Sequence, residues 1–566
     1  MLLSNVQILV IANITTLLIF NSCKTRPEML QAEKSMVYTT AALATPHPIS
    51  TQVGETILAN GGNAIDAAVA IQFAMAVVYP RAGNLGGGGF MVYRSSDGEV
   101  QALDYRERAP ADAFRDMYLD ENGEVIPGLS TYGHRAAGVP GTVAGIAAMY
   151  ERHGSLPWKD LVQPAIDLAK NGFPITQTEI ERQLSARADI NRLNESSPFL
   201  EDFQQGDLFI QPELSRTLER IRDQGEDGFY KGRTAELIVR EMESNGGLIT
   251  AEDLESYRAS WRVPINCEYR GYQVFAMPPA SSGGIALCQM LGMLEAYDLN
   301  QMGFQSAEAG HHTIEAMRRS YQDRAEHLGD SDFYPVPIDS LLNADYLKQK
   351  MTTFSPDSAS VSNPSEVSLQ METFETTHIS IVDAAGNAVS ITTTLNGSYG
   401  CKVIVDGAGF FLNNEMDDFS SKPGVPNMFG LVGAEANAIA PGKRMLSSMT
   451  PTIITKEGDL FLVLGTPGGS TIITSVLQVF TNIADYGMAL DKAIQQPRFH
   501  HQWLPDSVLL EPGAFDESTQ TKLESMGHGF KTVKEIGKLK AIHKLPNGHL
   551  HAAADPRHPD DDVGGF

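Results

Sequence analysis

Two strand-like runs in the last third of the chain give the clearest hydrophobic and polar pattern. Thr376–Val382 and Ala388–Leu395 are rich in β-branched residues, and Asp383–Asn387 between them consists of turn-forming residues. This pattern predicts a β-hairpin. If the two runs pair end to end across the five-residue turn, the antiparallel register places Thr394 opposite Thr376, because the numbers of paired residues sum to a constant.

Helical periodicity dominates the first two thirds of the chain. Thr51–Tyr79 is predicted to be helical, with a break at Gly61–Asn63 and an end at Pro80. Residues 141–370 are predicted to alternate amphipathic helices with loops, and Thr250 opens one helix with a capping box.

Glycine-rich and irregular segments separate these elements. The loop Gly83–Gly89 lacks the spacing of a phosphate-binding motif, so we expect close backbone packing there, followed by a strand near Phe90–Tyr93. Ser355–Leu369 has no apolar periodicity and is predicted to be a mobile tail. Near the C-terminus, a strand at Asp459–Gly465 is followed by a glycine turn and a helix over about Ser470–Ala484.

Strands from one part of the chain and helices from both parts predict an α+β protein with two β-sheets between helical layers. The chain has 566 residues, of which 42% are hydrophobic, enough for a substantial core. Its formal net charge of −26 lacks the basic footprint of nucleic-acid binders, so no nucleic-acid partner is expected.

The N-terminus predicts export. Ile8–Phe20 is apolar but shorter than the roughly 20 residues of a spanning helix, and it ends at Ser22-Cys23. Residues 1–23 are therefore interpreted as a signal peptide. The end of this stretch resembles a bacterial lipoprotein cleavage site, which would make Cys23 the lipidated first residue, and an ordinary secretory signal stays open. We expect a periplasmic protein or one anchored to a membrane by lipid.

Cysteines and histidines give no sign of a metal site. The four cysteines have neither zinc-ligand spacing nor a clear disulfide framework, and no metal or other cofactor is expected. The pairs His311-His312 and His500-His501 would point to opposite faces of a strand, which favours structural or surface roles.

Thr376 suggests a chemistry that depends on a new chain terminus. The hydroxyl of an N-terminal threonine can attack a carbonyl while its own α-amine accepts the proton. A free α-amine has a pKa of about 7.7–8.0, which suits a general base near neutral pH. We therefore hypothesise a precursor that cleaves itself between Glu375 and Thr376.

Ordered motifs from about Ala41 to the C-terminus connect this hypothesis to a known family. The most specific segments are Gly83–Phe90, Asp104–Glu107, Pro279–Gly284, Thr376–His378, Thr394–Asn396, Leu412–Phe419, Leu446–Met449, Pro467–Ser470 and Pro497–Trp503. On these motifs the chain resembles the γ-glutamyltranspeptidases (γ-glutamyltransferases, or glutathione hydrolases), members of the N-terminal nucleophile hydrolases.

The resemblance implies a four-layer αββα sandwich. It further implies two intertwined subunits from one precursor, a large one over residues 24–375 and a small catalytic one over 376–566. Together they form a heterodimer of two fragments.

The resemblance also implies catalytic and binding roles at matching positions. Thr376 is the expected nucleophile, Thr394 is expected to hold its amine, and Gly468 and Gly469 match the oxyanion-hole pair. The expected donor-binding residues carry charges and hydroxyls suited to a free amino acid group: Arg106, Ser447 and Ser448 for its carboxylate, Glu415 and Asp418 for its ammonium, and Asn396 as a neutral contact beside Thr394 and Gly469.

One segment departs from the family pattern. Lys422–Lys443 corresponds to the lid over the donor pocket in many members, and Phe429 stands where a tyrosine is expected near its tip. Because phenylalanine lacks the hydroxyl, we expect a lid that is present but less firmly latched.

The implied reaction is γ-glutamyl transfer from glutathione or related donors to an amino acid, a dipeptide or water, through an ester on Thr376. Three alternatives remain: an acylase of glutaryl-type amides, an enzyme acting on γ-linked polyglutamate or cell-wall attachment, and an inactive surface lipoprotein that binds a ligand. Glu415 and Asp418 disfavour the first, and the lid disfavours the second.

Overall fold

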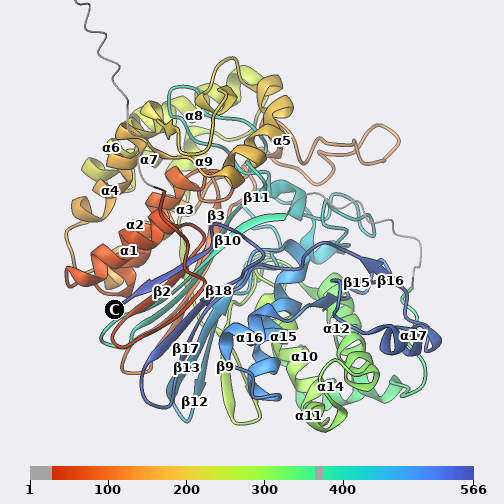
Figure 1. Cartoon of the computed structure of the whole chain (residues 1–566). Coiled ribbons are helices and arrows are strands. Elements are labelled where there is room, and N and C mark those ends of the chain that lie inside the picture. Colours follow the sequence, from red (N-terminus) through yellow and green to blue (C-terminus); the bar gives the residue numbers. More distant parts are fainter. Residues whose placement is uncertain (1–28, 364–373) are drawn as a thin grey trace, which may run out of the picture.

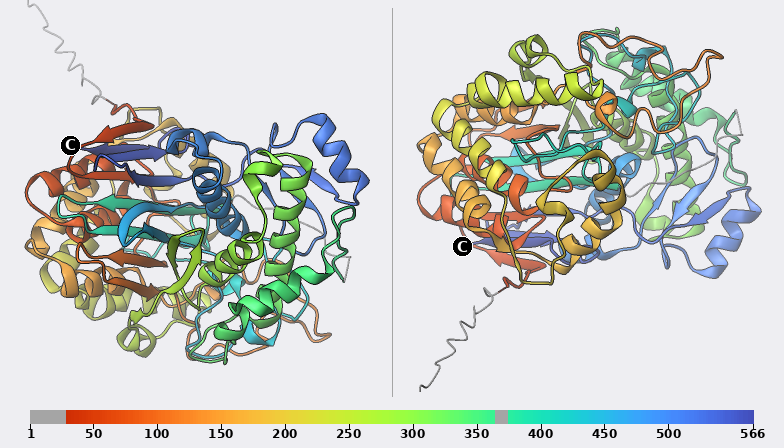
Figure 2. Two further views of the ribbon diagram at one scale, coloured as in Figure 1. Left: turned by 90° about the horizontal axis from the view of Figure 1, so that it is seen from below. Right: turned by 90° about the horizontal axis from the view of Figure 1, so that it is seen from above.

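The computed structural model describes residues 29–363 and 374–566 and contains two stacked β-sheets covered on both outer faces by helices. Figures 1 and 2 show this αββα layering, with α1–α9 over one sheet and α10–α16 over the other. The predicted signal peptide, residues 1–23, lies outside the described residues. Among those that are described, no helix is long and apolar enough to cross a membrane.

The first sheet contains the predicted hairpin at its centre. Its strands pair antiparallel in the order β19 (Asp562–Gly565), β2 (Ala42–Thr45), β10 (Phe374–Val382), β11 (Ala388–Gly397), β3 (Gly88–Arg94), β4 (Val100–Tyr105) and β7 (Ser260–Arg262). Strands from before and after residue 375 are thus interleaved within one sheet.

The second sheet is also antiparallel and has seven strands. Their order is β1 (Ser35–Tyr38), β18 (Leu550–Ala554), β17 (Lys540–Lys544), β13 (Asp459–Gly465), β12 (Thr452–Lys456), β9 (Tyr272–Ala276) and β8 (Ile265–Tyr269). Two small sheets contain β5 (Phe173–Pro174) with β6 (Leu208–Phe209), and β14 (Phe499–His500), β15 (Val508–Leu510) and β16 (Phe530–Thr532).

The predicted register of the hairpin is confirmed: Thr376 pairs with Thr394. Both strands are buried throughout their described side chains because the second sheet covers one face and helices cover the other. The pairing shifts by one residue between Phe374 and Thr376, so the ladder becomes irregular at Glu375.

Helices of the first outer layer pack on the first sheet. The predicted break at Gly61–Asn63 is confirmed, since α1 (Pro48–Ala59) ends before it and the side chain of Asn63 caps α2 (Ala64–Val78). The layer continues with α3 (Thr142–His153), α4 (Trp158–Asn171), α5 (Gln177–Leu193), α6 (Pro212–Gln224), α7 (Asp227–Tyr230), α8 (Gly232–Asn245) and α9 (Ala251–Ser256), the last opened by the predicted capping box at Thr250.

The second outer layer packs on the second sheet through a separate hydrophobic core. Its main helices are α10 (Gly283–Leu294), α12 (Ala307–His327) and α15 (Ile472–Ala484). The shorter ones are α11 (Leu299–Met302), α13 (Ile338–Leu341), α14 (Ala344–Lys350), α16 (Leu490–Gln495) and α17 (Glu517–Ser525).

Two sequence expectations for the middle of the chain are wrong. Residues 141–370 are not helices and loops alone, because this region also supplies three strands of the large sheets. β7 belongs to the first sheet, and β8 and β9 belong to the second. The alternation of apolar and polar residues over Ile265–Tyr269 and the Arg270-Gly271 turn were the available signals.

A disulfide also joins Cys267 on β8 to Cys288 on α10, with 5.9 Å between their Cα atoms. These two cysteines are 21 residues apart, and only the packing of α10 against β8 brings them together.

Candidate active site

Two threonine hydroxyls lie beside the Glu375–Thr376 peptide bond. The Oγ1 atoms of Thr376 and Thr394 are 3.2 Å apart, and Thr394 Oγ1 donates to the carbonyl oxygen of Glu375 at 3.4 Å. The backbone N–H of Asn396 donates to Thr394 Oγ1 at 2.8 Å, which orients this hydroxyl. A nucleophile, a hydroxyl donor and a carbonyl therefore meet at the predicted cleavage point.

The glycine-rich loop after α2 positions Thr394. The side-chain amide of Asn84 donates to the carbonyl of Thr394 at 2.9 Å. A Cβ on Gly87 would lie 2.1 Å from that same carbonyl oxygen, and one on Gly86 would lie 2.2 Å from the carbonyl of Phe411. Only glycine allows this close backbone approach, as the sequence predicted.

A small cavity opens on Thr376. Its lining includes eight of the residues expected from the sequence: Arg106, Thr376, Thr394, Asn396, Asp418, Ser447, Ser448 and Gly469. Arg324, Phe429, Leu431, Met449 and Ile472 complete it. Glu415 and Gly468 lie just behind this lining, the first in contact with Arg106 and the second next to Gly469.

Arg106 is the buried charged centre of the cavity. Its guanidinium binds Glu415 Oε1 at 2.7 Å and Asp418 Oδ2 at 2.5 Å, while its Nε–H donates to the carbonyl of Met445 at 3.3 Å. Glu415 and Asp418 are presented together by one 3-10 turn, Glu415–Asp418. Burial raises the pKa of both carboxyls, and the charge of Arg106 opposes this rise.

Glu107 adds a third carboxyl to this cluster that the sequence did not single out for a role. It is fully buried, lies 3.6 Å from Arg106 Nη1, and neither of its oxygens has a hydrogen-bond partner in the described part of the chain. Burial raises its pKa to about 8, although Arg106 pulls it down.

The Glu107 carboxyl predicts a pH-dependent stability. Its folded-state pKa of about 8 exceeds the ordinary value of 4.5, so the stability it contributes is complete below about pH 4.5 and is lost as pH rises through about 8. Glu107→Gln mimics the protonated form. As the pH rises from 5 to 8.5, the melting temperature of this variant should therefore fall less than that of the parent. Thermal melts across this range test the prediction, and parallel curves for the two proteins would refute it.

Residues at α10 and on α12 make hydrogen bonds to the serine pair Ser447-Ser448. Ser282 Oγ donates to the carbonyl of Ser447, and Arg324 contacts both Ser282 Oγ at 3.1 Å and Ser448 Oγ at 3.3 Å. Arg324 therefore places a second buried cation at the cavity. Sequence reasoning missed it because it lies in a helix without a motif of its own.

The predicted strand, turn and helix around the glycine pair are confirmed. β13 ends at Gly465, and a 3-10 turn over Gly469–Thr471 leads directly into α15. Gly468 and Gly469 have φ values of 143° and 54°, a region that favours glycine. The first N–H groups of a helical turn have no intrahelical acceptor and favour negative charge.

The expected lid segment covers the cavity. Phe429 lines it, and the carbonyl of Phe429 accepts a hydrogen bond from Gln502 Nε2 at 3.2 Å. Asn427 ties the lid tip to the site, since its Nδ2 donates to Asp418 Oδ1 at 3.0 Å while its Oδ1 accepts from the backbone of Phe429. Sequence reasoning missed both Asn427 and Gln502.

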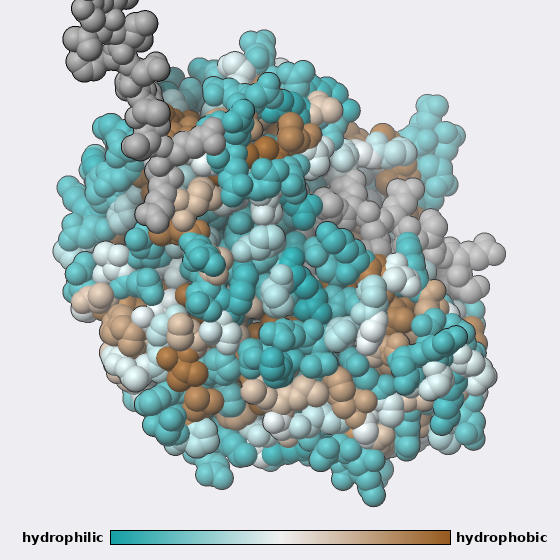
Figure 3. All heavy atoms as spheres, in the orientation of Figure 1, coloured by the Kyte–Doolittle hydropathy of each residue, from teal (hydrophilic) through white to brown (hydrophobic). Residues whose placement is uncertain are grey.

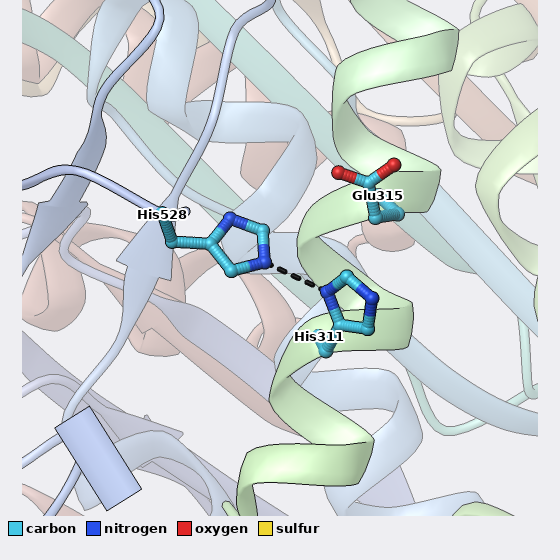
Figure 4. A group of neighbouring side chains, drawn as sticks. All are labelled: His311, Glu315 and His528. Carbon is cyan, nitrogen blue, oxygen red and sulfur yellow. Dashed lines mark hydrogen bonds between the residues drawn. The ribbon is translucent and has the colours of Figure 1, made fainter. Parts of the chain in front are cut away.

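One histidine group lies outside this site, on the far side of α12 (Figure 4). His311, Glu315 and His528 have ligand-type atoms within 4.8 Å of one another, and His311 Nδ1 is 2.7 Å from His528 Nε2. Glu315 is ion-paired with both Arg318 and Arg319, whose charges disfavour a cation here. His311 and His312 lie in helix α12 and are buried, so the expected strand and the surface role are wrong, whereas burial agrees with the structural role that was the other expectation.

The segment that leads toward residue 363 is held against this group. His311 Nε2 lies 2.8 Å from the carbonyl of Ser355, and Glu315 accepts from the backbone and hydroxyl of Ser360. The first part of the tail predicted from Ser355 to Leu369 is thus bound to α12, and residues 364–369 lie outside the described residues.

Comparisons with known proteins agree with this geometry. The family model described as Gamma-glutamyltranspeptidase matches residues 50–565. The glutathione hydrolase proenzyme of Pseudomonas sp. (strain A14) is 45% identical over 541 residues, covering 93% of each chain.

Among solved structures, cephalosporin acylase from Bacillus halodurans is similar with a TM-score of 0.82 and 25% identity, covering 96% of this chain and 98% of that one. The γ-glutamyltranspeptidase of Helicobacter pylori gives a TM-score of 0.54 and 46% identity, covering 56% of this chain and 91% of that one.

An αββα sandwich with a threonine poised at the start of a central strand defines the class of N-terminal nucleophile hydrolases. Within that class, the chain belongs to the γ-glutamyltranspeptidase family.

Proposed function

We propose that this chain is a γ-glutamyltransferase and glutathione hydrolase that becomes active by cutting itself between Glu375 and Thr376. The observation that carries this proposal is the placement of the two threonine hydroxyls. They lie next to the Glu375 carbonyl and open on a cavity that carries charges of both signs.

Self-cleavage proceeds through an ester. Thr376 Oγ1 attacks the carbonyl carbon of Glu375, the C–N bond breaks, and the hydroxyl proton moves to the departing nitrogen of Thr376. Thr394 Oγ1, which donates to that carbonyl in the uncut chain, stabilises the developing oxyanion. Water then hydrolyses the ester and leaves a carboxylate at Glu375 and a free amine on Thr376.

Cleavage yields a large subunit that ends at Glu375 and a small one over residues 376–566. Both sheets contain strands of both fragments, which supports a heterodimer that stays together after the cut.

Transfer uses the new terminus. The freed amine of Thr376 accepts the hydroxyl proton as Oγ1 attacks the γ-amide carbon of the donor, and the same proton passes to the departing amine. Thr394 holds the Thr376 amine. The N–H groups of Gly468 and Gly469 stabilise the oxyanion, and the resulting γ-glutamyl ester is resolved by water, an amino acid or a dipeptide.

The charges of the cavity suit the α-amino and α-carboxylate groups of a γ-glutamyl donor. Arg106 offers a planar fork to the carboxylate, aided by the hydroxyls of Ser447 and Ser448. Asp418 and Glu415 attract the ammonium, and Asn396 adds a neutral contact. On binding, the donor's two charges would take over part of the pairing that Arg106 now makes with Asp418.

The alternatives are less well supported. An acylase would gain nothing from paired carboxylates around Arg106, and the identity is 45% to the glutathione hydrolase proenzyme against 35% to the acylase ACY 1 proenzyme of Pseudomonas sp. (strain V22). A polyglutamate-type substrate needs an open groove, whereas here the lid segment that contains Phe429 covers a small cavity. A binding lipoprotein would have no use for a cut at Glu375.

An assay with a chromogenic γ-glutamyl anilide, with and without a dipeptide acceptor, tests the proposal. We expect release of the aniline by the cleaved protein and faster release with the acceptor. Correctly cleaved protein that hydrolyses a glutaryl amide but not the γ-glutamyl anilide would favour the acylase alternative.

The lid gives a prediction about the fate of the ester. Phe429 lines the cavity without a hydroxyl, and its backbone makes hydrogen bonds with Gln502 and Asn427. Phe429→Tyr restores a hydrogen-bonding tip, and we expect it to change the ratio of transfer to hydrolysis by about two- to fivefold, a free-energy difference of one hydrogen bond. Product analysis at fixed acceptor concentration measures this ratio, and an unchanged ratio would show that the hydroxyl plays no part in latching.

We propose export from the cytoplasm, with or without lipid on Cys23. The apolar N-terminal stretch motivates this proposal, and the Cys267–Cys288 disulfide supports it because disulfides persist in oxidising compartments. Mass spectrometry of the mature large subunit tests it by locating the first residue and any lipid.

A further inference from the structure

The side chain of Glu375 occupies a buried cationic pocket next to the scissile bond. Glu375 is only 2% exposed, and its carboxylate lies 3.3 Å from Arg182 Nε and 3.6 Å from Arg81 Nε. Burial alone would raise the pKa of this carboxyl, but the charges of Lys538, Arg81 and Arg182 lower it below its ordinary value.

Arg81 is itself fixed in place. Its Nη1 binds Glu179 at 2.5 Å, its Nη2 contacts His558 Nε2 at 2.7 Å, and its guanidinium stacks over the ring of Tyr79. The carboxylate of Glu375 therefore meets a preorganised cation rather than a flexible one.

The charges of this pocket balance only when Glu375 is present. Arg81, Arg182 and Lys538 are cationic. Glu179 pairs with Arg81 and Glu535 pairs with Lys538, which leaves Glu375 to compensate the third charge, that of Arg182. Removing the charge of Glu375 leaves buried guanidinium groups under-compensated, which is costly in a site excluded from water.

The backbone at Glu375 departs from regular pairing. The register shift between Phe374 and Thr376 places Glu375 at the irregularity, and its carbonyl lies against Thr394 Oγ1. Such an irregularity disrupts the ladder hydrogen bonds locally, so contacts other than strand pairing must help to orient this carbonyl.

We propose that the Glu375 side chain is a positioning group for self-cleavage, with Arg81, Arg182 and Lys538 forming its receptor. The carboxylate anchored on one side of the strand holds the scissile carbonyl against the hydroxyls of Thr376 and Thr394. This inference rests on the proposed self-cleavage and adds a specificity for an acidic residue before the cut.

The test follows cleavage of freshly purified precursor over time on denaturing gels. Glu375→Gln keeps the shape but removes the charge, and we expect cleavage at least about tenfold slower than in the parent. Glu375→Asp keeps the charge on a shorter side chain and should cleave faster than Glu375→Gln. The matched control is Asp485→Asn, which removes a carboxylate with a fully buried side chain that pairs with Arg270 at the C-terminal end of α15, and it should cleave at the parent rate.

Two results would overturn the inference. One is cleavage of Glu375→Gln at the parent rate, and the other is equal slowing of Glu375→Gln and Asp485→Asn, which would reduce the effect to general stability. Hydroxylamine adds a separate readout because it cleaves an ester at Glu375. If Glu375 positions the carbonyl for attack, hydroxylamine does not restore cleavage of Glu375→Gln, and full restoration would also overturn the inference.

Other results would refute the proposed self-cleavage itself rather than the role of Glu375. A parent chain that never cleaves, or a Thr376→Ala chain that does, would refute self-cleavage by Thr376 itself, whatever the Glu375 variants do.

Discussion

Thr376→Ala is expected to remain a single uncut chain and to lose γ-glutamyl transfer by about 10⁴-fold or more, because the substitution removes the only proposed nucleophile of both reactions. Thr376 Oγ1 lies 3.2 Å from Thr394 Oγ1 and lines the cavity. Gel electrophoresis and the anilide assay measure the two effects on the same preparation.

The control for this substitution is a threonine of similar burial in a strand of the other sheet. Thr455 on β12 is 5% exposed, as is Thr376, and takes no part in the site. Thr455→Val should be cut and active. Two bands of about 375 and 191 residues for Thr376→Ala would show that another group performs the cleavage.

Arg106→Gln is expected to reduce kcat/KM for the γ-glutamyl anilide by about 10²-fold or more. The substitution removes the fork proposed for the donor carboxylate, and it leaves Glu415 and Asp418 buried without their cation. Loss of one partner of a buried charge pair costs about 2–5 kcal/mol, and each 1.4 kcal/mol is a factor of about ten. We expect most of the loss to appear in KM.

Arg240→Gln is the matched control for the donor site. Arg240 also pairs with a carboxylate, that of Asp406, but both side chains are about half exposed or more. Because exposed pairs contribute about 0–1 kcal/mol, this variant should keep the parent kcat/KM. Equal losses for Arg106→Gln and Arg240→Gln would contradict the assigned role of Arg106.

The sequence predicted helices and strands best where the periodicity of apolar residues and the turn-forming residues indicated the same element. The hairpin around Thr376 follows from β-branched alternation and a turn of fixed length, so even its register was predictable. The break between α1 and α2 and the glycine turn before α15 follow from capping and glycine chemistry in the same way.

Long-range packing could not be predicted from such local rules. The disulfide depends on how α10 crosses β8, and Arg324 reaches Ser448 from a helix with no motif of its own. The cationic pocket of Glu375 combines Arg81, Arg182 and Lys538, which are far apart in the sequence and meet only when both sheets are complete. The binding residues themselves were found through resemblance to a family, because charge and spacing alone left surface roles open for them.

N-terminal sequencing of the subunits in an active preparation tests the central claim most directly. The account predicts one fragment that begins Thr-Thr-His-Ile, starting at Thr376. An active preparation without such a fragment would contradict it.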